Sequence, residues 1–361
     1  MTRYDIAIVG AGIAGASLAA ELAPHARVLL LEAEERPGYH ATGRSAAFWS
    51  ETYGGPAIQP LTTASGAFLR DGGFLDPLGA LHIGRGEEAE AVDALLRVFA
   101  GTSVELQPTD PRAHLPGLRP GWILGVLEPS CAYIDVAALH AHYLAAARCA
   151  GVAIVTAAAL ESAHRDGQWQ LRTGAGQFAA DILVNAAGAW ADSVARAAGA
   201  RPLNIQPYRR TMLQLATDPA PPAGCPHILH VGGSFYFKPE AGGRLWLSPH
   251  DETASEPCDA APEELDIALA IHRFEHVVDW RVDRLEHKWA GLRSFAPDRL
   301  PVYGFDPAVP GFFWCAGQGG FGIQTAPAAA RLSASLLLGR VPDVSDRGVD
   351  PPGYSPARFA T

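Results

Sequence analysis

The sequence predicts a mixed α/β fold, in which a parallel-sheet domain of the Rossmann type is joined to a second domain built on an antiparallel sheet. A strand, a helix and a second strand open the chain between residues 6 and 31. Strands with alternating polar and apolar residues begin near Ile205, and a strand, a glycine-rich turn and a helix close the chain from Phe312 to Leu338. Strands that alternate with helices favour a parallel sheet, whereas alternation with period two favours an antiparallel sheet with one face toward a cavity.

The opening segment has the sequence of a dinucleotide site. The strand Ile6–Val9 runs into Gly10, Gly12 and Gly15, which are spaced G-x-G-x-x-G and followed by a helix of small residues and leucines. Gly10 permits the tight turn, Gly12 lets a pyrophosphate approach the helix N-terminus, and Gly15 lets the helix pack closely on the sheet. Glu32 ends the second strand, where it can accept hydrogen bonds from ribose hydroxyls.

Composition narrows the classes of function. The chain has 361 residues, of which 48% are hydrophobic, so it can bury the cores of two structural domains. A formal charge of −10 disfavours nucleic acid or an anionic membrane surface as the main partner. The five cysteines are odd in number and never spaced C-x-x-C, so no disulfide framework is predicted and a reducing, cytoplasmic setting fits best.

The run Ile6–Ala20 carries no charge and admits two other interpretations. As a signal-peptide core it lacks the usual basic flank, since only Arg3 precedes it and Asp5 follows at once. As a membrane helix it is too short to span a bilayer comfortably, and Glu21 and Pro24 follow directly. We therefore expect no integral membrane segment.

Between the end motifs the chain is expected to alternate between helices, loops and strands. Apolar residues at helical spacing predict helices over Leu61–Leu69, Glu87–Phe99, Asp135–Ala150 and Pro262–Trp280. Short strands are expected over Val152–Val155, Trp169–Arg172 and Asp181–Asn185, and Pro108–Pro120 forms a proline-rich connection. The closing segment divides into a strand (Phe312–Ala316), a glycine-rich loop (Gly317–Gly322) and a helix (Ile323–Leu338) with Pro327 in its first turn.

Two loops are expected beside the bound cofactor. Pro37–Ala47 is too polar and too rich in turn formers to continue the sheet, so we expect it to cover the cofactor. Ala186–Trp190 follows a strand and contains Gly188, which either lets the backbone approach the cofactor or only forms a tight turn.

Five motifs that follow one another along nearly the full chain identify a family: GAGIAG, GYHATGRSAA, VNAAGAWAD, WAGLRSFAPD and AGQGGFGIQTAPA. Together they resemble the D-amino acid oxidase (DAO) superfamily of FAD-dependent oxidoreductases, and within it the D-arginine dehydrogenases. The resemblance implies FAD, whereas composition and spacing alone leave NAD open. It implies a discontinuous FAD-binding domain (residues 1–76, 148–202 and 297–361) interleaved with a substrate-binding domain (residues 77–147 and 203–296). The cofactor contacts it implies are Gly10, Gly12, Ile13, Ala14, Gly15, Glu32, Gly43, Arg44, Ser45, Ala46, Ala187, Gly188, Gly319, Gly320, Gly322 and Ile323.

The resemblance also implies oxidation of an amine α to a carboxylate, for which arginine is a suitable anchor because its fork meets a carboxylate with two parallel hydrogen bonds. Arg209 and Arg210 are neighbours in the strand Tyr208–Leu215, so their side chains face opposite ways and cannot both line one cavity. The family match places Arg210 at the substrate carboxylate and leaves Arg209 at the surface. A surface salt bridge is the alternative for Arg210, and a structural role is the alternative for Arg293, which matches the second carboxylate-binding arginine.

Two tyrosines complete the predicted clamp. In Ser234–Lys238, Phe235 and Phe237 share one face and are expected in the core, so the hydroxyl of Tyr236 points to the polar side. The family position that Tyr236 matches helps to hold the substrate carboxylate. Tyr53 matches another pocket residue, with simple packing as an equal alternative.

The sequence departs from the D-arginine dehydrogenases at two pocket positions. Ala80 replaces the glutamate that pairs with the substrate guanidinium, and Phe48 replaces a histidine. A buried guanidinium without a carboxylate would cost several kcal/mol, so arginine and lysine are expected to be poor substrates. A wall of Phe48, Trp49 and Trp246 favours an apolar or aromatic side chain instead.

A second comparison concerns the electron acceptor. Sarcosine oxidases of the superfamily activate oxygen with a lysine at the position that Trp246 matches, and they link FAD to a cysteine that Trp289–Phe295 lacks. Noncovalent FAD is therefore expected, with a slight preference for a dehydrogenase. A quinone, another carrier and oxygen all stay open as acceptors.

The predicted reaction is oxidative deamination of a D-amino acid by hydride transfer from Cα to flavin N5, without an evident side-chain base. The imino acid would hydrolyse to a 2-oxo acid and ammonia. A 2-hydroxy-acid or N-methyl-amino-acid dehydrogenase or oxidase is an alternative, because the clamp would serve those substrates equally. A catalytically silent flavin-binding sensor or scaffold is the alternative of another class.

Histidine patterns do not predict a metal site. His272–His276 fits the H-x-x-E-H pattern of zinc peptidases, but a five-residue match is frequent by chance, and the acidic residues around it are typical of a solvated helix face. His227 and His230 lack a helical context and give a weaker signal still.

Overall fold

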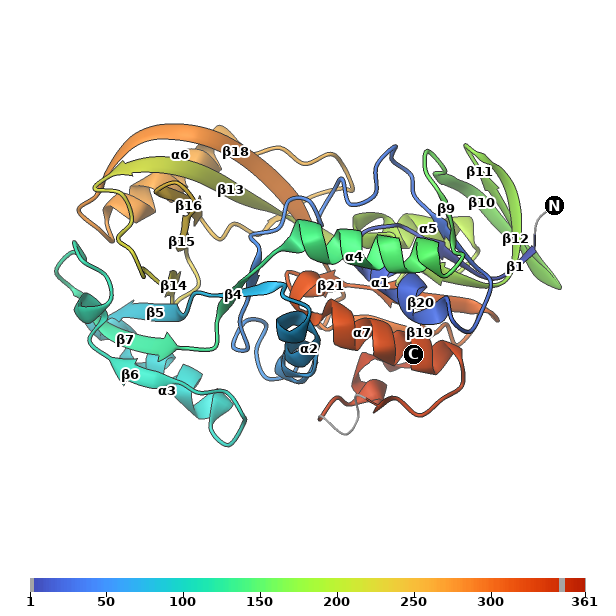
Figure 1. Ribbon diagram of the computed structural model, residues 1–361, viewed down its shortest axis with the longest axis horizontal. Helices are drawn as coiled ribbons and strands as arrows, with labels where there is room; N and C mark the ends of the chain where they lie inside the picture. The colour runs from blue at the N-terminus through green and yellow to red at the C-terminus, as the bar shows by residue number, and fades with distance from the viewer. Residues whose placement is uncertain (1–2, 344–347, 361) are drawn as a thin grey trace.

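Two large sheets, one in each lobe of an elongated molecule, organise the chain (Figure 1). The computed structural model describes residues 3–343 and 348–360. The outermost residues of the predicted ranges 1–76 and 297–361, and residues 344–347 within the latter, lie outside the described residues. The predicted α/β class with a second, antiparallel sheet is confirmed.

The first sheet has eight strands and is parallel at its centre, where β1 pairs with β12 on one side and β2 on the other. Its strands are β1 (Arg3–Val9), β2 (Val28–Leu31), β9 (Ala153–Val155), β10 (Leu160–Asp166), β11 (Gln168–Thr173), β12 (Gly176–Asn185), β19 (Val302–Phe305) and β20 (Phe312–Ala316). Ile6 and Ile8 face one core cluster, whereas Ala7 and Val9 face another on the opposite side. Burial on both faces explains why β1 is an apolar run without alternation.

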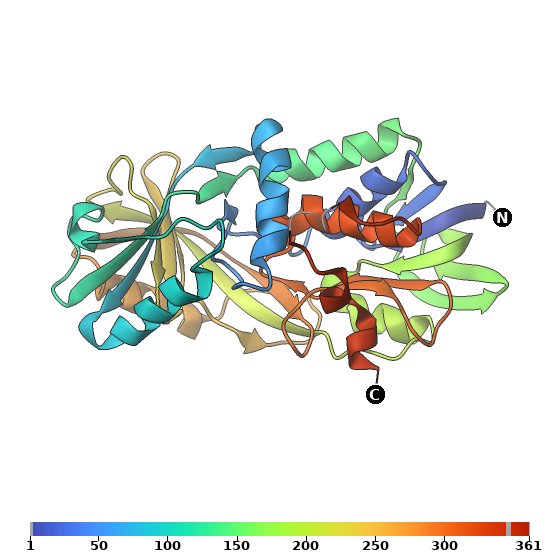
Figure 2. The ribbon, with the colours of Figure 1, turned by 90° about the horizontal axis from the view of Figure 1, so that it is seen from below.

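Helices cover both faces of this sheet. On one side α1 (Ile13–Leu22), α4 (Val136–Cys149) and α7 (Gly322–Leu337) share the core of Ile6 and Ile8 (Figure 1). On the other side lies α5 (Ala191–Ala197). The helix α2 (Gln59–Asp71) packs on α7 at the junction of the lobes, where Figure 2 shows it upright.

The three opening glycines make the turn into α1 possible. Gly10 has a φ of +102°, and a Cβ there would lie 2.4 Å from the carbonyl oxygen of Ala186. A Cβ on Gly15 would lie 1.9 Å from the carbonyl oxygen of Gly10. The helix can therefore approach the end of β1 only without side chains at these positions.

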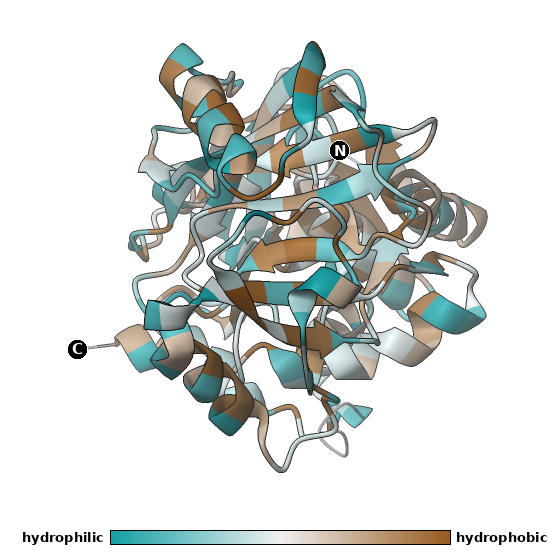
Figure 3. Cartoon of the chain, turned by 90° about the vertical axis from the view of Figure 1, so that its left-hand side faces the viewer, coloured by the Kyte–Doolittle hydropathy of each residue, from teal (hydrophilic) through white to brown (hydrophobic). Residues whose placement is uncertain are grey.

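The second sheet has ten strands, and its longest ladder is the antiparallel pair β13 and β18 near one edge. Its strands are β5 (Ala80–Arg85), β6 (Gln107–Thr109), β7 (Trp122–Glu128), β13 (Gln206–Asp218), β14 (His227–His230), β15 (Tyr236–Glu240), β16 (Arg244–Ser248), β17 (Thr253–Ala254), β18 (Arg281–Phe295) and β21 (Gln318–Gly319). Figure 3 views this lobe from its outer end, where apolar and polar colours mix along the elements. One face packs under α6 (Glu264–Glu275), where Phe235, Phe237 and Phe274 share a core.

A three-stranded sheet joins the lobes. Its strands are β3 (Phe48–Trp49), β4 (Leu75–Pro77) and β8 (Ala132–Ile134). The remaining helix, α3 (Ala89–Phe99), follows β5. Among the described residues, no helix is both long and apolar enough to cross a bilayer.

Several predicted boundaries differ from the structure. The helix α6 ends at Glu275 rather than Trp280, because Val277 and Val278 turn into the core under the sheet. Pro327 is the sixth residue of α7, not part of its first turn. The range 77–147, which is predicted to belong to the substrate-binding domain, contains most of α4. This helix packs against α1 in the first lobe through Leu139 and Tyr143.

We predict that Gly15→Ala disrupts the turn, because its Cβ meets backbone that cannot yield. The variant should lose at least about 2 kcal/mol of unfolding free energy and most of its FAD, as measured by urea titration and flavin absorbance. Gly86→Ala is the control, since its Cβ would meet only Ile123 Cδ1 at 3.5 Å, and it should stay within about 0.5 kcal/mol of the parent. Equal behaviour of the two variants would contradict the assigned role of Gly15.

Candidate active site

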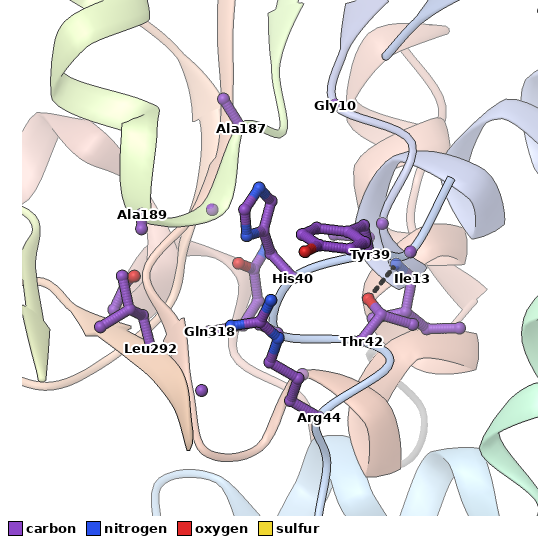
Figure 4. Close-up of a pocket in the computed structure, with 18 of the residues that line it drawn as sticks. Gly10, Ile13, Tyr39, His40, Thr42, Arg44, Ala187, Ala189, Leu292 and Gln318 are labelled. Atoms are coloured by element: carbon purple, nitrogen blue, oxygen red, sulfur yellow. Dashed lines mark hydrogen bonds between the residues drawn. The ribbon is translucent and has the colours of Figure 1, made fainter. Parts of the chain in front are cut away.

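A cavity of about 430 Å³ lies between the carboxyl ends of β1 and β2 and the inner face of the second sheet. Of the predicted cofactor residues it is lined by Gly10, Gly12, Ile13, Ala14, Glu32, Arg44, Ser45, Ala46, Ala187, Gly188, Gly319, Gly320, Gly322 and Ile323. Phe48, Arg210 and Arg293 line it as well. Gly15 packs behind the turn, and Gly43 lines a second cavity. The structure thus brings segments that are distant in the sequence together around one space (Figure 4).

At one end of the cavity the carboxylate of Glu32 is buried and fixed by backbone. Its Oε2 accepts from the Ala11 amide at 2.9 Å, and its Oε1 accepts from the Glu34 amide at 3.0 Å. A carboxylate has further lone pairs, so these bonds leave capacity for ribose hydroxyls. Glu32 therefore stays the predicted ribose acceptor.

The loop Pro37–Ala47 contributes two residues to the cavity, Thr42 and His40, that no sequence motif indicated. Thr42 Oγ1 accepts from the Ile13 amide at 3.0 Å, at the first residue of α1 (Figure 4). His40 lies 2.8 Å from Glu34 through Nε2 and contacts the ring of Trp190. Only the polar composition of the loop hinted at these contacts, since they depend on how it folds back over α1.

The residues present fit an FAD molecule. Gly10 and Gly15 leave no room for a Cβ, the N-terminus of α1 opens toward the cavity, and a buried acid stands at the end of β2. This donor set suits a pyrophosphate and an adenosine ribose. The other end of the cavity reaches Arg210 and Arg293 on the second sheet, where an isoalloxazine ring would meet a substrate.

Two arginines and two tyrosines meet at this far end. Arg293 Nη1 donates to the Tyr53 hydroxyl at 2.5 Å, and Arg293 Nη2 donates to the Tyr236 hydroxyl at 3.2 Å. The Tyr236 hydroxyl donates to Met212 Sδ at 3.1 Å. A thioether is a weak acceptor, so this proton can turn to a carboxylate when one enters.

Arg210 is the second cation of the cluster and is 3% exposed. Its Nε donates to the Asp251 carbonyl oxygen at 2.7 Å and its Nη2 to Glu252 at 3.3 Å, whereas its buried Nη1 has no partner among the described residues. Burial and the nearby Arg293 lower the pKa of Arg210. An anion bound here would relieve both effects.

Arg209 is not at the surface, contrary to the prediction. Its side chain is 12% exposed, donates from Nη2 to Asp266 at 2.9 Å and pairs with Glu263. It fastens α6 to the outer face of β13. The prediction that Arg209 and Arg210 point to opposite faces of β13 was correct, but the helix α6 covers the face that carries Arg209.

Phe48 and Trp49 point to opposite sides of β3. Phe48 lies 5.0 Å from the ring of Tyr53, whereas Trp49 lies in the core of the first lobe and donates from Nε1 to the Thr62 carbonyl oxygen. The predicted place of Trp49 in the substrate wall is therefore corrected: it packs on α2. Trp246 lies 5.0 Å from the ring of Trp289 and lines the second cavity, not the one that Phe48 lines, so its predicted place in the same substrate wall is corrected as well.

A buried carboxylate that the sequence did not reveal supports the segment leading to Tyr53. Glu128 is fully buried and accepts from Ser50 Oγ at 2.9 Å, from the Glu51 amide at 2.7 Å and from Thr52 Oγ1 at 2.6 Å. Burial raises the pKa of Glu128, but hydrogen bonds from His82, Thr52 and Ser50 outweigh it and lower the pKa overall. The ionised carboxylate thus fixes the backbone before Tyr53.

His272 and His276 lie together at the C-terminal end of α6. The rings of His272 and His276 lie 4.2 Å apart, and His276 Nδ1 contacts the carbonyl oxygen of His272. Across residues 3–343 and 348–360, no three His, Cys, Asp or Glu side chains are placed to hold a metal ion.

Comparison with known proteins gives consistent matches. A family model described as FAD dependent oxidoreductase (DAO) matches residues 5–336. The bifunctional protein ThiO/ThiG of Synechocystis sp. is 27% identical over all of this chain, which spans 55% of that protein. Glycine oxidase of Pseudomonas aeruginosa is 28% identical over 98% of both chains. Among solved structures, glycine oxidase from Geobacillus kaustophilus aligns with a TM-score of 0.84 at 24% identity over 98% of both chains, and L-proline dehydrogenase from P. horikoshii with 0.84 at 20% identity over 97% of both.

We predict that Glu128→Gln destabilises the protein, because it removes a buried charge and turns an amide NH₂ toward donors that need an acceptor. The free energy of unfolding in urea should fall by about 2–4 kcal/mol. Glu90→Gln is the control, since Glu90 is 82% exposed and pairs with Arg97 at the surface, and it should change stability by less than about 0.5 kcal/mol. A loss for Glu128→Gln no larger than for the control would show that the network is not essential.

Proposed function

The chain belongs to the DAO family of FAD-dependent oxidoreductases, and from this premise and the arginine cluster we infer that it oxidises the amine of an α-amino acid. The predicted superfamily and noncovalently bound FAD are confirmed. The narrower likeness to D-arginine dehydrogenases gives way to relatives named glycine oxidase. One observation carries the inference about substrate: a buried, unpartnered Nη1 of Arg210 beside Arg293, Tyr53 and Tyr236, at the end of the cofactor cavity.

The side chains of the cluster would bind and orient the substrate. Arg210 and Arg293 hold the carboxylate, and the hydroxyl of Tyr236 turns from Met212 to the same group. Phe48 closes the site against water on the side of β3. This fixes Cα toward the cavity, where bound FAD supplies a hydride acceptor at N5.

The substrate amine would enter neutral. His250, which faces Tyr236 at 5.6 Å, is kept uncharged because burial and Arg210 lower its pKa to about 3. The two carboxylates that adjoin the clamp, Asp251 and Glu252, both pair with the Arg210 guanidinium and are not free to act as the base. The substrate therefore loses its ammonium proton to solvent, and the imino acid product leaves to hydrolyse to a 2-oxo acid and ammonia.

We propose a D-amino acid with an apolar or aromatic side chain as the substrate. The D configuration is proposed only from the resemblance of the sequence motifs to D-amino acid oxidases and D-arginine dehydrogenases, and the D/L substrate panel below tests it. The absence of a carboxylate at Ala80 argues against arginine and lysine, and Phe48 offers an aromatic wall. Glycine is a second candidate, because relatives that cover 93–98% of the chain are named glycine oxidase.

Anaerobic addition of D- and L-amino acids to the purified flavoprotein tests this proposal, with bleaching of the flavin band as the signal. Reduction by D-leucine or D-phenylalanine ahead of D-arginine is expected. Preference for glycine would support the second candidate. If only 2-hydroxy acids or N-methyl amino acids reduce the flavin, the substrate is one of these classes and not a primary amine. If none of the compounds reduces it, the protein is a flavin-binding sensor or scaffold.

We predict that Arg210→Lys lowers kcat/KM by about 100-fold, mainly through KM, because lysine keeps the charge but cannot form two parallel hydrogen bonds with a carboxylate. Steady-state kinetics with the best amino acid from the panel measure the effect. The matched control is Arg209→Lys, one residue away on the other face, which should stay within about threefold of the parent. An Arg210→Lys variant with unchanged KM would refute the carboxylate clamp.

We also predict a simple pH profile. Because His250 has its pKa lowered to about 3, it stays neutral from pH 5 upward and cannot produce an inflection near neutrality. A plot of log kcat/KM should rise with pH to a plateau, and its one inflection should move when the substrate amine is changed. An inflection near pH 6–7 that is the same for every substrate would reveal a protein base.

A further inference from the structure

His227, the first residue of β14, is a buried histidine without a hydrogen-bond partner. Its side chain is fully buried, and neither Nδ1 nor Nε2 bonds to any described residue. Most buried polar atoms in proteins are paired, because an unpaired one loses its water without compensation. A buried imidazole with two free nitrogens therefore points to a partner that the chain itself does not provide.

The sheet register places His227 on the face that carries the clamp. It aligns with Ala80 on the parallel strand β5, and the pairing of Leu229 with Tyr236 sets it opposite Lys238 on β15. Side chains of paired residues point to the same face. The His227 ring accordingly lies 4.6 Å from Phe48, which lines the cavity, and 5.5 Å from Tyr236.

The polar neighbours of His227 in this row are already satisfied. Glu128 on β7 pairs with Ala80 from the side opposite to His227. Its carboxylate accepts hydrogen bonds from three groups of residues 50–52. Lys238 donates to Glu240 at 3.0 Å and lies 4.3 Å from the ring centroids of Tyr133 and Trp246. Between them, the methyl group of Ala80 fills little space. In this row, the described residues leave unpaired only both ring nitrogens of His227 and the indole N–H of Trp246, which pairs with Lys238 in the sheet register, and of these two only His227 lies against Phe48.

The charge state of His227 limits what it can bind. Burial, Lys238 and His82 lower its pKa well below the ordinary value, so the ring is neutral. A neutral imidazole offers one N–H donor and one acceptor nitrogen. This pair suits a hydroxyl, a carboxamide or an indole N–H. An ammonium would be repelled by the nearby Lys238, and a carboxylate would find Lys238 already paired with Glu240.

We propose that His227 is a specificity residue that forms a hydrogen bond with an uncharged polar group on the substrate side chain. This rests on the proposed function and modifies its side-chain preference: uncharged side chains stay favoured over those of arginine and lysine, and among them one with a single uncharged polar group, such as a phenol, hydroxyl or carboxamide, is preferred over its hydrocarbon isostere. Phe48 contacts the apolar part of that side chain, and His227 contacts its polar end.

Isosteric substrate pairs test this proposal in the holoenzyme. The pairs are D-tyrosine with D-phenylalanine, D-threonine with D-valine, and D-asparagine with D-leucine, so that the polar group is presented at different distances from Cα. In the parent enzyme kcat/KM should favour the polar member of at least one pair by about tenfold or more, since a site built for a hydrogen bond rejects the analogue without it.

Two variants separate specificity from packing. His227→Met keeps the volume and removes both hydrogen-bonding atoms, so the ratio should fall to about one, whereas His227→Gln keeps a donor and an acceptor and should restore part of it. Flavin absorbance per protein shows that each variant is folded and loaded. The inference is overturned if no polar member is preferred, or if His227→Met leaves the ratio unchanged. Flavin reduction by no amino acid would overturn the proposed function itself, and this inference with it.

Discussion

The active site depends on two guanidinium groups that the fold holds near each other away from water. Arg210 is almost completely buried and feels the charge of Arg293, which lowers its pKa. The protein compensates for the burial and the charge repulsion only in part. The Asp251 carbonyl oxygen and Glu252 accept hydrogen bonds from Arg210, and the hydroxyls of Tyr53 and Tyr236 accept from Arg293. Such a cluster is a site with stored affinity for an anion, because a carboxylate would supply the missing charge and occupy the free Nη1. The two buried guanidinium groups therefore favour an anionic group in the ligand, whatever the rest of the ligand contains.

The elements around the cluster are arranged to keep these groups in place. Arg210 and Arg293 come from the long paired strands β13 and β18, whose register fixes the distance between them along the sheet. Tyr53 instead lies on a loop, and the loop is held by the buried carboxylate of Glu128, which comes from β7 near the other edge of the same sheet. Rigid strands carry the charged groups, and a hydrogen-bonded network gives the loop a comparable precision. The first lobe contributes mainly backbone at Gly10, Gly188 and Gly320.

This division explains which parts of the molecule could be predicted from the sequence. A backbone site requires glycines at fixed spacing, so Gly10, Gly12 and Gly15 could be read directly. The clamp required knowledge of a family, because an arginine in a strand looks the same whether it binds a ligand or an ion partner. Alternation along β13 separated Arg209 from Arg210, but could not show that α6 covers Arg209. The prediction that Trp49 lines the pocket together with Phe48 was wrong for a related reason. Two adjacent aromatic residues in a strand face opposite ways, so only one of them can belong to the pocket.

His227 shows the limit of local patterns most clearly. Along the chain it is one of two histidines near a proline, and nothing in its neighbours indicates a role. Its environment comes from pairing with residues 80 and 238, which lie 147 positions upstream and 11 downstream, and from Phe48 on a third sheet. The same pairing sets Ala80 beside it, so an alanine at one position and a neutral imidazole at the next are parts of one surface. A surface with a hydrogen-bonding group and no charge at these two positions would discriminate between side chains by polarity rather than by charge, because a desolvated imidazole penalises a hydrocarbon that leaves both nitrogens unpaired.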